Sequence, residues 1–495
     1  MATPFRTRIP RLTDSYKVSH AAQYPDGTSK VYSYFESRGG KFPVTGLFGL
    51  QYILMAYLEG EVATQRDINR DQHFFAAHFF GNGALHNKAG WQRIVDVHGG
   101  RLPVRIMAAP EGTIAPNSNV LFTIENLDPQ LYWLTNYIES ILLHAWSAST
   151  VMTGSRNSKQ ILFNALERSG DPSGLPFKLH DFGFRGVSSV ETAATAGAAH
   201  LVNFMGTDTL IACDLIAQYY SGKRPEEVEA MSDDEYGRFI AENMAGHSIP
   251  ASEHSTITTW GEDGEIDAFR NMLKVYPSGL VACVSDSWDI DRACSELWPS
   301  LKGEIEARDG LLVVRPDSGE PTDVVPRILG HLAEGFGYTT NSKGFKVLHD
   351  QVRVIQGDGI DFDSISTILD AVMDAGFSAD NIAFGSGGGL LQKVNRDTQR
   401  VAIKCSHAII NGEETDVFKR PKTDPTKDSK RGRLALVQTH DGLATVQESD
   451  ADNYAGGNQL IEVFNNGEVC NLQSFSDIRR RAELPEVAEL SAATA

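Results

Sequence analysis

The feature that most constrains the fold is a pattern repeated between about residues 176 and 391, in which a short apolar stretch ends in a polar turn before a helix-like stretch. Strands and helices that alternate in this way are typical of parallel β/α units, and the number of repeats predicts closure into a barrel. A doubly wound open sheet is the alternative. In both folds, ligands bind at the rim formed by the carboxyl ends of the strands. The expected strand ends lie at residues 178–183, 204–208, 250–255, 281–286, 312–319, 352–359 and 381–391.

The last of these turns is unusually rich in glycine. The apolar residues 381–384 are followed by Gly-Ser-Gly-Gly-Gly at 385–389 and then by helix-forming residues. Without side chains in the way, successive backbone N–H groups can converge on phosphate oxygens beside a helix N-terminus. The pattern therefore predicts a phosphate-binding turn, and the alternative is a flexible turn without a ligand.

The segments on either side of the repeat differ from it. Residues up to about 126 mix helix-like and strand-like stretches, which indicates an α+β region. Residues 221–246 form an acidic insertion that we expect on the surface, and residues 419–433 form a basic, turn-rich loop. We expect residues 489–495 to be a disordered tail.

The amino-acid composition limits the kinds of partner that the protein is expected to bind. The formal net charge of −19 argues against general binding to nucleic acid or to an anionic membrane surface. The five cysteines are scattered and form no CxxC pair, so they suggest neither a zinc site nor a disulfide framework, and a reducing cytoplasm fits them best. No apolar run is long enough for a signal peptide or a membrane-spanning helix.

The rim residues indicate the ligand. Arg315, Asp317 and Asp358 follow two of the expected strands, although any single aspartate there can be a simple turn former. Carboxylates bind ribose hydroxyls or magnesium, and arginine binds phosphate through two parallel hydrogen bonds. Together with the glycine-rich turn, these residues imply a phosphorylated sugar.

Two further rim segments carry aromatic and imidazole groups. Phe182 and Arg185 suit a flat heterocycle, stacked on the ring and hydrogen-bonded at its edge, although a buried phenylalanine in the core is equally expected. His254 lies between Glu253 and Ser255, where a carboxylate could orient the imidazole. A structural histidine is the alternative reading of this position.

Ten blocks, spread in order from about residue 14 to residue 436, closely resemble the nicotinamide phosphoribosyltransferases, which are type II phosphoribosyltransferases related to the nicotinate enzymes. The resemblance implies a homodimer with active sites at the subunit interface, in which each chain has an irregular (β/α) barrel at 151–404 and a discontinuous α+β domain at 1–150 and 405–495. The blocks are DSYKVSH, YPDGTSKVYSYFESR, DFGFRGVSS, HLVNFMGTDT, EHSTITTWG, VSDSWD, RPDSG, VIQGDG, NIAFGSGGGLLQK and RGRLAL.

The implied reaction is transfer of the 5-phosphoribosyl group from 5-phosphoribosyl 1-pyrophosphate to nicotinamide, which gives nicotinamide mononucleotide and pyrophosphate for NAD salvage. Magnesium is the implied cofactor, and ATP hydrolysis is an optional stimulus through phosphorylation of His254, with Asp286 orienting that histidine. The resemblance assures no protein ligand for magnesium, which would be held through pyrophosphate with Asp317 or Asp358.

The resemblance also assigns binding residues. Those for nicotinamide are Phe182 on one ring face, Tyr16 of the other subunit on the opposite face, Arg185 and Asp208 at the carboxamide, and Asp14 beside the tyrosine. Those for the ribose and pyrophosphate are Arg315, Asp317, Gly357 and Asp358. Those for the phosphates are Gly387, Gly388, Arg38, Arg396, Lys404, Lys419 and Lys427.

The choice of base depends on Asp208, because a carboxylate accepts a hydrogen bond from an amide but repels a nicotinate carboxylate. A nicotinate phosphoribosyltransferase is nevertheless an alternative, as is a non-catalytic phosphosugar-binding barrel. A barrel isomerase or aldolase would need a base at the strand ends, for which Glu253 is the only obvious candidate. The chain departs from the family at Ala282 and Ala402, where relatives can carry serine, and in the length of the 221–246 insertion.

Overall fold

The computed structural model describes residues 8–422 and 428–494, and its chain forms two compact units. The first unit comprises Met1–Thr153, Gln218–Ser232 and Asn395–Ala482, and the second comprises Gly154–Ala217, Asp233–Val394 and Glu483–Ala495. The return to the first unit comes at residue 395 rather than 405 because the strand that starts at Val401 pairs with an N-terminal strand.

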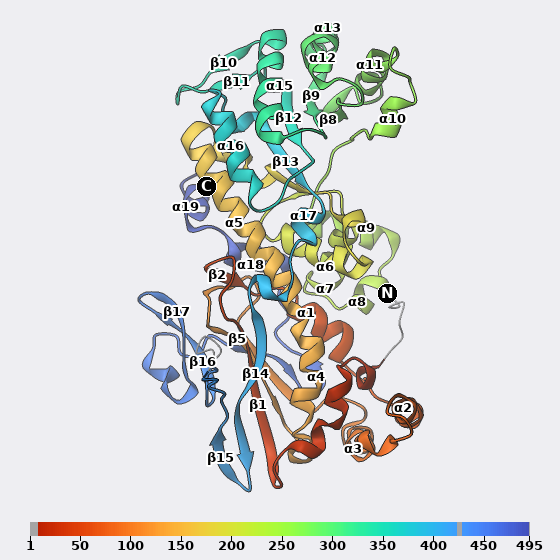
Figure 1. The fold of residues 1–495 in the computed structure, drawn as a ribbon, viewed down its shortest axis with the longest axis vertical. Helices are drawn as coiled ribbons and strands as arrows, with labels where there is room; N and C mark the ends of the chain where they lie inside the picture. Colours follow the sequence, from red (N-terminus) through yellow and green to blue (C-terminus); the bar gives the residue numbers. More distant parts are fainter. Residues whose placement is uncertain (1–7, 423–427, 495) are drawn as a thin grey trace. The chain divides into compact units, whose positions relative to one another are not determined.

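The first unit is built on a seven-stranded sheet in the order β15-β14-β1-β5-β3-β18-β19, with antiparallel neighbours throughout. β1 lies between β14 and β5, so both ends of the chain contribute to one sheet, as the resemblance implied (Figure 1). The strands are β1 Thr28–Ser37, β3 Val104–Ala108, β5 Val120–Asn126, β14 Val401–Ile410, β15 Glu413–Asp416, β18 Ile461–Asn465 and β19 Glu468–Val469.

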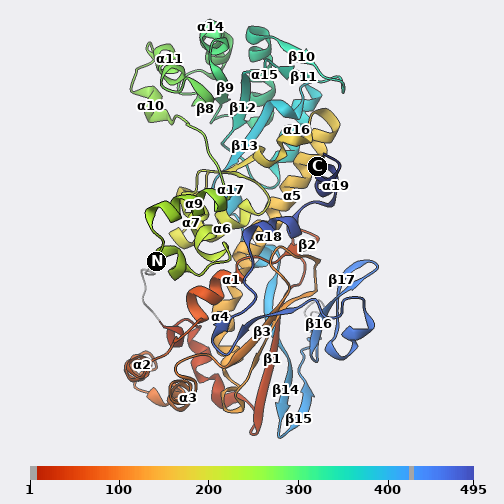
Figure 2. The same cartoon turned by 180° about the vertical axis from the view of Figure 1, so that it is seen from behind.

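Helices, the two-stranded sheet β2-β4 and the hairpin β16-β17 complete the first unit (Figure 2). The helix α2 begins in a capping box, in which Thr64 and Asp67 satisfy each other's backbone N–H groups, and α3 ends at Gly99 in the left-handed conformation. The remaining elements are α1 Leu50–Ile53, α2 Gln65–His78, α3 Lys88–His98, α4 Leu134–Leu143, α8 Pro225–Glu229, α18 Phe475–Ala482, β2 Val44–Gly46, β4 Ile114–Pro116, β16 Leu434–Thr439 and β17 Gly442–Gln447.

The second unit contains a six-stranded parallel sheet in the order β7-β6-β13-β12-β9-β8 (Figure 1). Six of the seven predicted strand ends belong to these strands. They are β6 Leu179–Asp181, β7 Gly206–Thr207, β8 Ser278–Val284, β9 Asp309–Arg315, β12 Val352–Gln356 and β13 Ile382–Ser386.

The seventh predicted strand end, at 250–255, follows the segment that joins the two edges of this sheet. His247 bridges Gly206 of β7 in parallel, and Ala251 bridges Ala282 of β8 in the same sense. The backbone hydrogen bonds from Thr207 N to His247 O, at 3.0 Å, and from Ala282 N to Pro250 O, at 2.9 Å, fix the segment at both ends. The curled sheet is therefore an irregular barrel, and the prediction of an α/β barrel with an α+β domain is confirmed.

Helices follow most of the barrel strands, and α15 packs against β12 and α16. The boundary between the units falls within α5 Ala145–Ser169 and α7 Leu210–Tyr219. The remaining elements are α6 Val190–Leu201, α9 Asp233–Asn243, α10 His254–Thr258, α11 Glu265–Val275, α12 Ile290–Arg292, α13 Trp298–Ser300, α14 Lys302–Glu306, α15 Pro321–Phe336, α16 Ser364–Asp374, α17 Gly388–Leu391, α19 Pro485–Thr494, β10 Tyr338–Thr340 and β11 Lys346–Leu348.

Two peripheral segments can be compared with what the sequence predicted for them. The 221–246 insertion forms α8 and α9, whose residues are mostly exposed except Val228 and Phe239. The end of the chain is helical to Thr494 rather than disordered from 489, because Glu483 binds Lys159 at 2.6 Å just before α19 and the residues that follow favour helix. No helix in the described ranges is both long and apolar enough to cross a membrane.

Candidate active site

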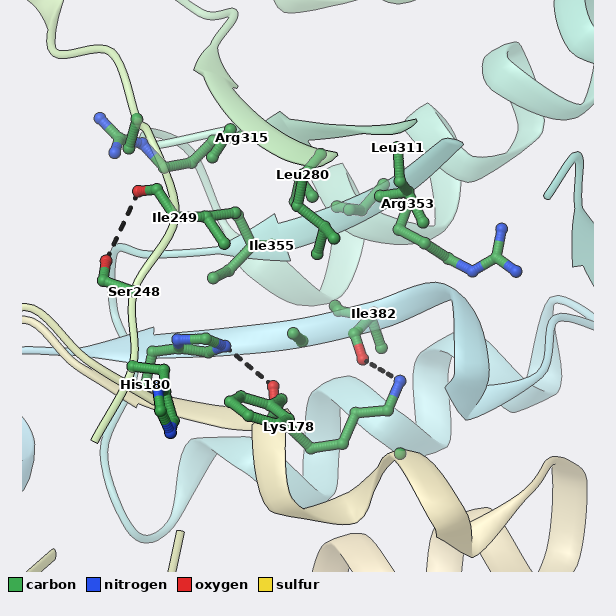
Figure 3. A pocket seen from close by; sticks show the side chains of 18 of the residues that line it. Lys178, His180, Ser248, Ile249, Leu280, Leu311, Arg315, Arg353, Ile355 and Ile382 are labelled. Carbon is green, nitrogen blue, oxygen red and sulfur yellow. Dashed lines mark hydrogen bonds between the residues drawn. The ribbon is translucent and has the colours of Figure 1, made fainter. Parts of the chain in front are cut away.

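The interior of the barrel is hollow. A cavity of about 570 Å³ runs inside the strands, lined by alternate residues such as Leu280 and Ala282 of β8 and Leu311 and Val313 of β9 (Figure 3). Barrels of this kind are usually filled by large branched side chains. Here Ala282 and the half-buried Ala383 take inward positions, and the space they leave has the size of a small-molecule site.

The end of the cavity away from the carboxyl ends of the strands is lined by Lys178 and Arg353, which both donate to backbone carbonyl oxygens. Figure 3 shows the hydrogen bond from Lys178 to Ile382. Lys178 Nζ donates to the carbonyl oxygens of Ala379, Asp380 and Ile382 at 2.9–3.1 Å, and burial lowers the pKa of this lysine to about 8. Arg353 likewise donates to the carbonyl oxygen of His349 at 2.8 Å. These cations hold the ends of the strands and the turns together.

Phe182, Asp208, Ser248 and Arg315 line the part of the cavity at the carboxyl ends of the strands. His180 lies between the two parts, and its Nε2–H donates to the carbonyl oxygen of Phe177 at 2.9 Å. Burial lowers the pKa of His180, so its imidazole is neutral at neutral pH. The cavity thus leads from a polar rim past a neutral imidazole to the end that carries Lys178 and Arg353.

Phe182 is placed by the glycine-rich turn. The Phe182 N–H donates to Ser386 O at 2.9 Å, and a Cβ on Gly385 would come within 1.9 Å of the Phe182 ring. A Cβ on Gly389 would meet Ile360 O at 2.3 Å. Two glycines of the turn are therefore needed for packing, which leaves the half-buried Gly387 and Gly388 for an anion at the start of α17.

Asp208 follows β7 and is held at its backbone and at its side chain. Its N–H donates to Asp181 O at 2.8 Å, and its carboxylate accepts a hydrogen bond from Ser248 Oγ. Asp181 is fully buried, accepts from Gly183 N at 2.7 Å, and has its pKa raised to about 6 by burial. Asp181 thereby connects the turn after Phe182 to the turn that carries Asp208.

The guanidinium group at the rim end of the cavity belongs to Arg315. Arg315 ends β9, lines the same cavity as Phe182 and Asp208, and has no hydrogen-bond partner for its Nε among the described atoms. Arg185 is exposed on the turn Phe184–Gly186 and does not line the cavity. The sequence analysis placed both arginines on one rim, with Arg185 at the carboxamide of the base and Arg315 at the ribose and pyrophosphate.

His254 starts α10 and lies between two carboxylates. Its Nε2–H donates to Asp286 Oδ1 at 3.1 Å, and its Nδ1 lies 3.9 Å from Asp317 Oδ2. Asp286 Oδ2 accepts from Asp317 N at 3.0 Å and from Ser318 Oγ at 2.5 Å. Burial raises the pKa of Asp317, and the charges of Asp286 and Asp358 raise it further, whereas Arg315 lowers it.

The basic residues predicted to bind phosphate lie in the first unit. Lys404 on β14 is 3.5 Å from the buried carboxylate of Glu36 on β1, and Lys430 also pairs with Glu36. Burial lowers the pKa of Lys404, and the nearby charges of Arg38 and Lys419 lower it further. Two cations therefore pair with a single carboxylate, with Arg38 and Lys419 near Lys404, and the sequence indicated neither Glu36 nor Lys430.

The other residues of the first unit that were predicted to belong to the site lie at separate positions. Tyr16 is 61 % exposed, and its ring contacts that of His20, while Asp14 accepts from Ser140 Oγ at 2.7 Å. Arg396 begins a short helical turn that ends at Thr398, and Lys427 lies outside the described residues. Ala402 lies on β14 opposite Glu36.

Comparison with known proteins identifies the family. Residues 177–468 match the model of the nicotinate phosphoribosyltransferase family, and residues 9–106 match the nicotinamide phosphoribosyltransferase N-terminal domain. The nicotinamide phosphoribosyltransferase of Xanthomonas campestris is 48% identical over 95% of this chain and 97% of its own. The chain belongs to the nicotinamide phosphoribosyltransferase family. The nicotinamide phosphoribosyltransferase of Acinetobacter baylyi is 32% identical over 96% of this chain and 97% of its own.

Solved structures agree with membership in the nicotinamide phosphoribosyltransferase family at the level of the fold. The nicotinate-nucleotide pyrophosphorylase of Pyrococcus furiosus matches with a TM-score of 0.59 at 16% identity, covering 97% of this chain and 96% of its own. Human nicotinic acid phosphoribosyltransferase matches with a TM-score of 0.53 at 15% identity, covering 95% and 92%. The resemblance inferred from the ten sequence blocks is confirmed.

Proposed function

We propose that this protein transfers the 5-phosphoribosyl group from 5-phosphoribosyl 1-pyrophosphate to nicotinamide, giving nicotinamide mononucleotide and pyrophosphate for NAD salvage. The observation that carries the choice of base is Asp208, whose carboxylate lines the same cavity as Phe182 and Arg315. An amide NH₂ can donate to this carboxylate, whereas a nicotinate carboxylate is repelled by it. The relatives named above carry the same activity in their names.

The cavity rim suits a pyridine ring with a carboxamide. The Phe182 ring offers an apolar face on which the heterocycle stacks, and Arg315 donates to the carbonyl oxygen of the amide. Asp208 accepts from the amide nitrogen at the same edge. Arg185, on its exposed turn, is then available to the phosphate side rather than to the base.

The reaction needs charge placement rather than a protein nucleophile. The neutral pyridine nitrogen attacks the anomeric carbon, the C–N bond forms as the C–O bond to pyrophosphate breaks, and the electron pair leaves with pyrophosphate. Asp317 and Asp358 orient the ribose hydroxyls, and the Gly357 backbone lies beside Asp317. The N–H groups of Gly387 and Gly388 bind the 5-phosphate, since the first N–H groups of a helix have no intrahelical acceptor.

The residues at this rim fit magnesium held mainly by the substrate. No group of three or more His, Cys, Asp or Glu side chains in the described part of the chain is arranged to bind a metal ion. Asp317 and Asp358 are close enough to affect each other's charge, and carboxylate oxygens suit magnesium together with phosphate oxygens and water. When bound, the ion would neutralise charge on the pyrophosphate.

ATP would act through His254. Its imidazole is 47 % exposed, and Asp286 binds the Nε2–H, which leaves the Nδ1 lone pair free to attack the γ-phosphorus of ATP as the bond to ADP breaks. The phosphoryl group adds up to two negative charges beside Asp317, near the expected place of pyrophosphate and its cation. This would favour the productive complex only when magnesium is present.

The active protein would be a cytoplasmic homodimer in which Tyr16 and Asp14 of one subunit complete the base site of the other. The exposure of Tyr16 supports this, because the ring is available to a partner. Arg38, Arg396, Lys404 and Lys419 would reach the phosphates across the same interface, together with Lys427.

The test is product formation from two bases. The purified protein is incubated with 5-phosphoribosyl 1-pyrophosphate, magnesium and either nicotinamide or nicotinate, with and without ATP, and mononucleotide is measured by chromatography. We expect nicotinamide mononucleotide to form with a clear preference over the nicotinate product. Asp208→Asn serves as the matched variant and should reduce this preference. Turnover of nicotinate alone, or binding of the pyrophosphate substrate without turnover, would contradict the proposal.

A further inference from the structure

Ser248 lies on the segment that closes the barrel, and both ends of that segment are fixed. His247 N donates to Met205 O at 2.7 Å on one side, and Ser252 N donates to Ala282 O at 3.0 Å on the other. Ser248 is therefore held on a strand-like stretch between two edges of the sheet, with its side chain at the cavity (Figure 3).

The Ser248 hydroxyl has one proton and two acceptors within reach. One is Asp208 Oδ1 in a short contact, and the other is the carbonyl oxygen of Ile249 at 3.5 Å. The carboxylate is closer and charged, so it takes the proton. Because the Asp208 N–H already donates to Asp181 O, both the backbone and one carboxylate oxygen of Asp208 are fixed.

We propose that Ser248 is a positioning residue that determines the preference for an amide base over a carboxylate base. Its hydroxyl occupies Oδ1 of Asp208 and so presents Oδ2 to the amide NH₂ of the substrate. A donor to a carboxylate also favours the ionised form, which is the form that repels nicotinate. This inference rests on the proposed function, in particular on the role of Asp208.

The charged groups around Asp208 explain why the Ser248 hydroxyl is needed as a hydrogen-bond donor. Asp181 and His180 lie close enough for their charges to be linked to that of Asp208. Asp181 adds negative charge beside Asp208, and His180 donates its Nε2–H to Phe177 O instead. Without the hydroxyl, the Asp208 carboxylate would lose the contact that fixes Oδ1 and could rotate away from the amide, so the preference for nicotinamide over nicotinate would fall.

The experiment compares Ser248→Ala, Ser248→Cys and Ser248→Thr with the unmodified full-length protein. For each protein, kcat/KM is measured for nicotinamide and for nicotinate between about pH 6 and 8. The alanine variant should lose about tenfold in the ratio of the two values, consistent with loss of a hydrogen bond to a charged group. Cysteine, a weaker donor, should give an intermediate ratio, and threonine, which keeps the hydroxyl, should stay close to the original.

A structural role alone would lower both activities together and leave the ratio unchanged. The KM for 5-phosphoribosyl 1-pyrophosphate and the thermal unfolding temperature are measured as controls, and both should change little. An unchanged ratio in the alanine variant would overturn the inference while leaving the proposed function intact. If the unmodified protein uses neither base, the proposed function itself fails.

Discussion

Replacing Gly385 by alanine should weaken binding of the base and leave binding of the phosphates almost unchanged. We expect this even though the glycine belongs to a turn with the sequence of a phosphate-binding loop. A Cβ at this position would lie 1.9 Å from one carbon of the Phe182 ring and 2.4 Å from the next, far inside van der Waals contact. Gly385 lies on β13 and is buried, so the backbone has little room to move, and the ring must rotate or shift.

The expected changes in stability and in KM follow from the two consequences of that shift of the Phe182 ring. Overpacking of a buried site costs about 1–3 kcal/mol, which corresponds to a decrease of about 2–4 °C in melting temperature for each kcal/mol in a unit of this size. Loss of the stacking face removes about 0.5–1.5 kcal/mol of aromatic interaction, so the KM for nicotinamide should rise about two- to tenfold. The KM for 5-phosphoribosyl 1-pyrophosphate should stay nearly constant.

The matched control is Gly388→Ala in the same turn. Its nearest heavy-atom contact would be Gly186 O at 3.2 Å, so packing changes less, but the methyl group would stand beside the N–H groups proposed to bind the 5-phosphate. We expect the opposite kinetic pattern, with a higher KM for the phosphoribosyl donor and an unchanged KM for nicotinamide. Steady-state kinetics and thermal unfolding of both variants decide between these roles. If Gly385→Ala raises the KM for the phosphoribosyl donor alone, the assignment of this glycine to Phe182 is incorrect.

Four other substitutions test three separate parts of the site. Burial raises the pKa of Asp181 from about 3.8 to about 6. The contribution of this carboxyl group to the free energy of unfolding is therefore fully present below about pH 3.8 and is lost as the pH rises to about 6. Asp181→Asn should remove this pH dependence of stability, measured by chemical denaturation across the same range. Glu36→Gln should release Lys404 and Lys430 and raise the KM for 5-phosphoribosyl 1-pyrophosphate about tenfold, and an equal change in the nicotinamide KM would contradict a role confined to phosphate. Arg315→Lys should reduce kcat/KM for nicotinamide by about tenfold or more, whereas Arg185→Lys should alter nicotinamide binding much less; equal losses would mean that cavity lining does not distinguish the two arginines.

The strand ends could be predicted because their signals are local. An apolar stretch followed by Asp, Ser or Gly reports the end of a buried strand within a few residues, and β9 and β12 lie where Arg315 and Asp358 indicated. Closure of the barrel was also foreseeable from the number of repeats. The hollow interior was not, since the outcome depends on which side Ala282 and Ala383 face once the sheet has curled.

Contacts between residues far apart in the chain could not be predicted from the sequence, for a similar reason. Ser248 binds Asp208 across 40 positions, and Lys430 binds Glu36 across 394. Neither pair has a spacing that marks it, because each contact depends on which distant segments the fold brings together and not on helical or turn periodicity. The sequence analysis did not single out Ser248, which precedes the expected strand end at 250–255.

The chemistry of the rim explains why the glycine-rich turn carries more than one function. A turn that only bound phosphate would need small residues where the N–H groups converge, at Gly387 and Gly388, and could carry larger ones at 385 and 389. The structure instead requires glycine at 385 and 389 as well, because Gly385 gives space to Phe182 and Gly389 passes close to Ile360 O. The same five residues therefore set the distance between the aromatic face that receives the base and the amides proposed to hold the 5-phosphate. Since the anomeric carbon must lie between those two groups, a rigid turn of this kind fixes the approach of the pyridine nitrogen to the carbon it attacks.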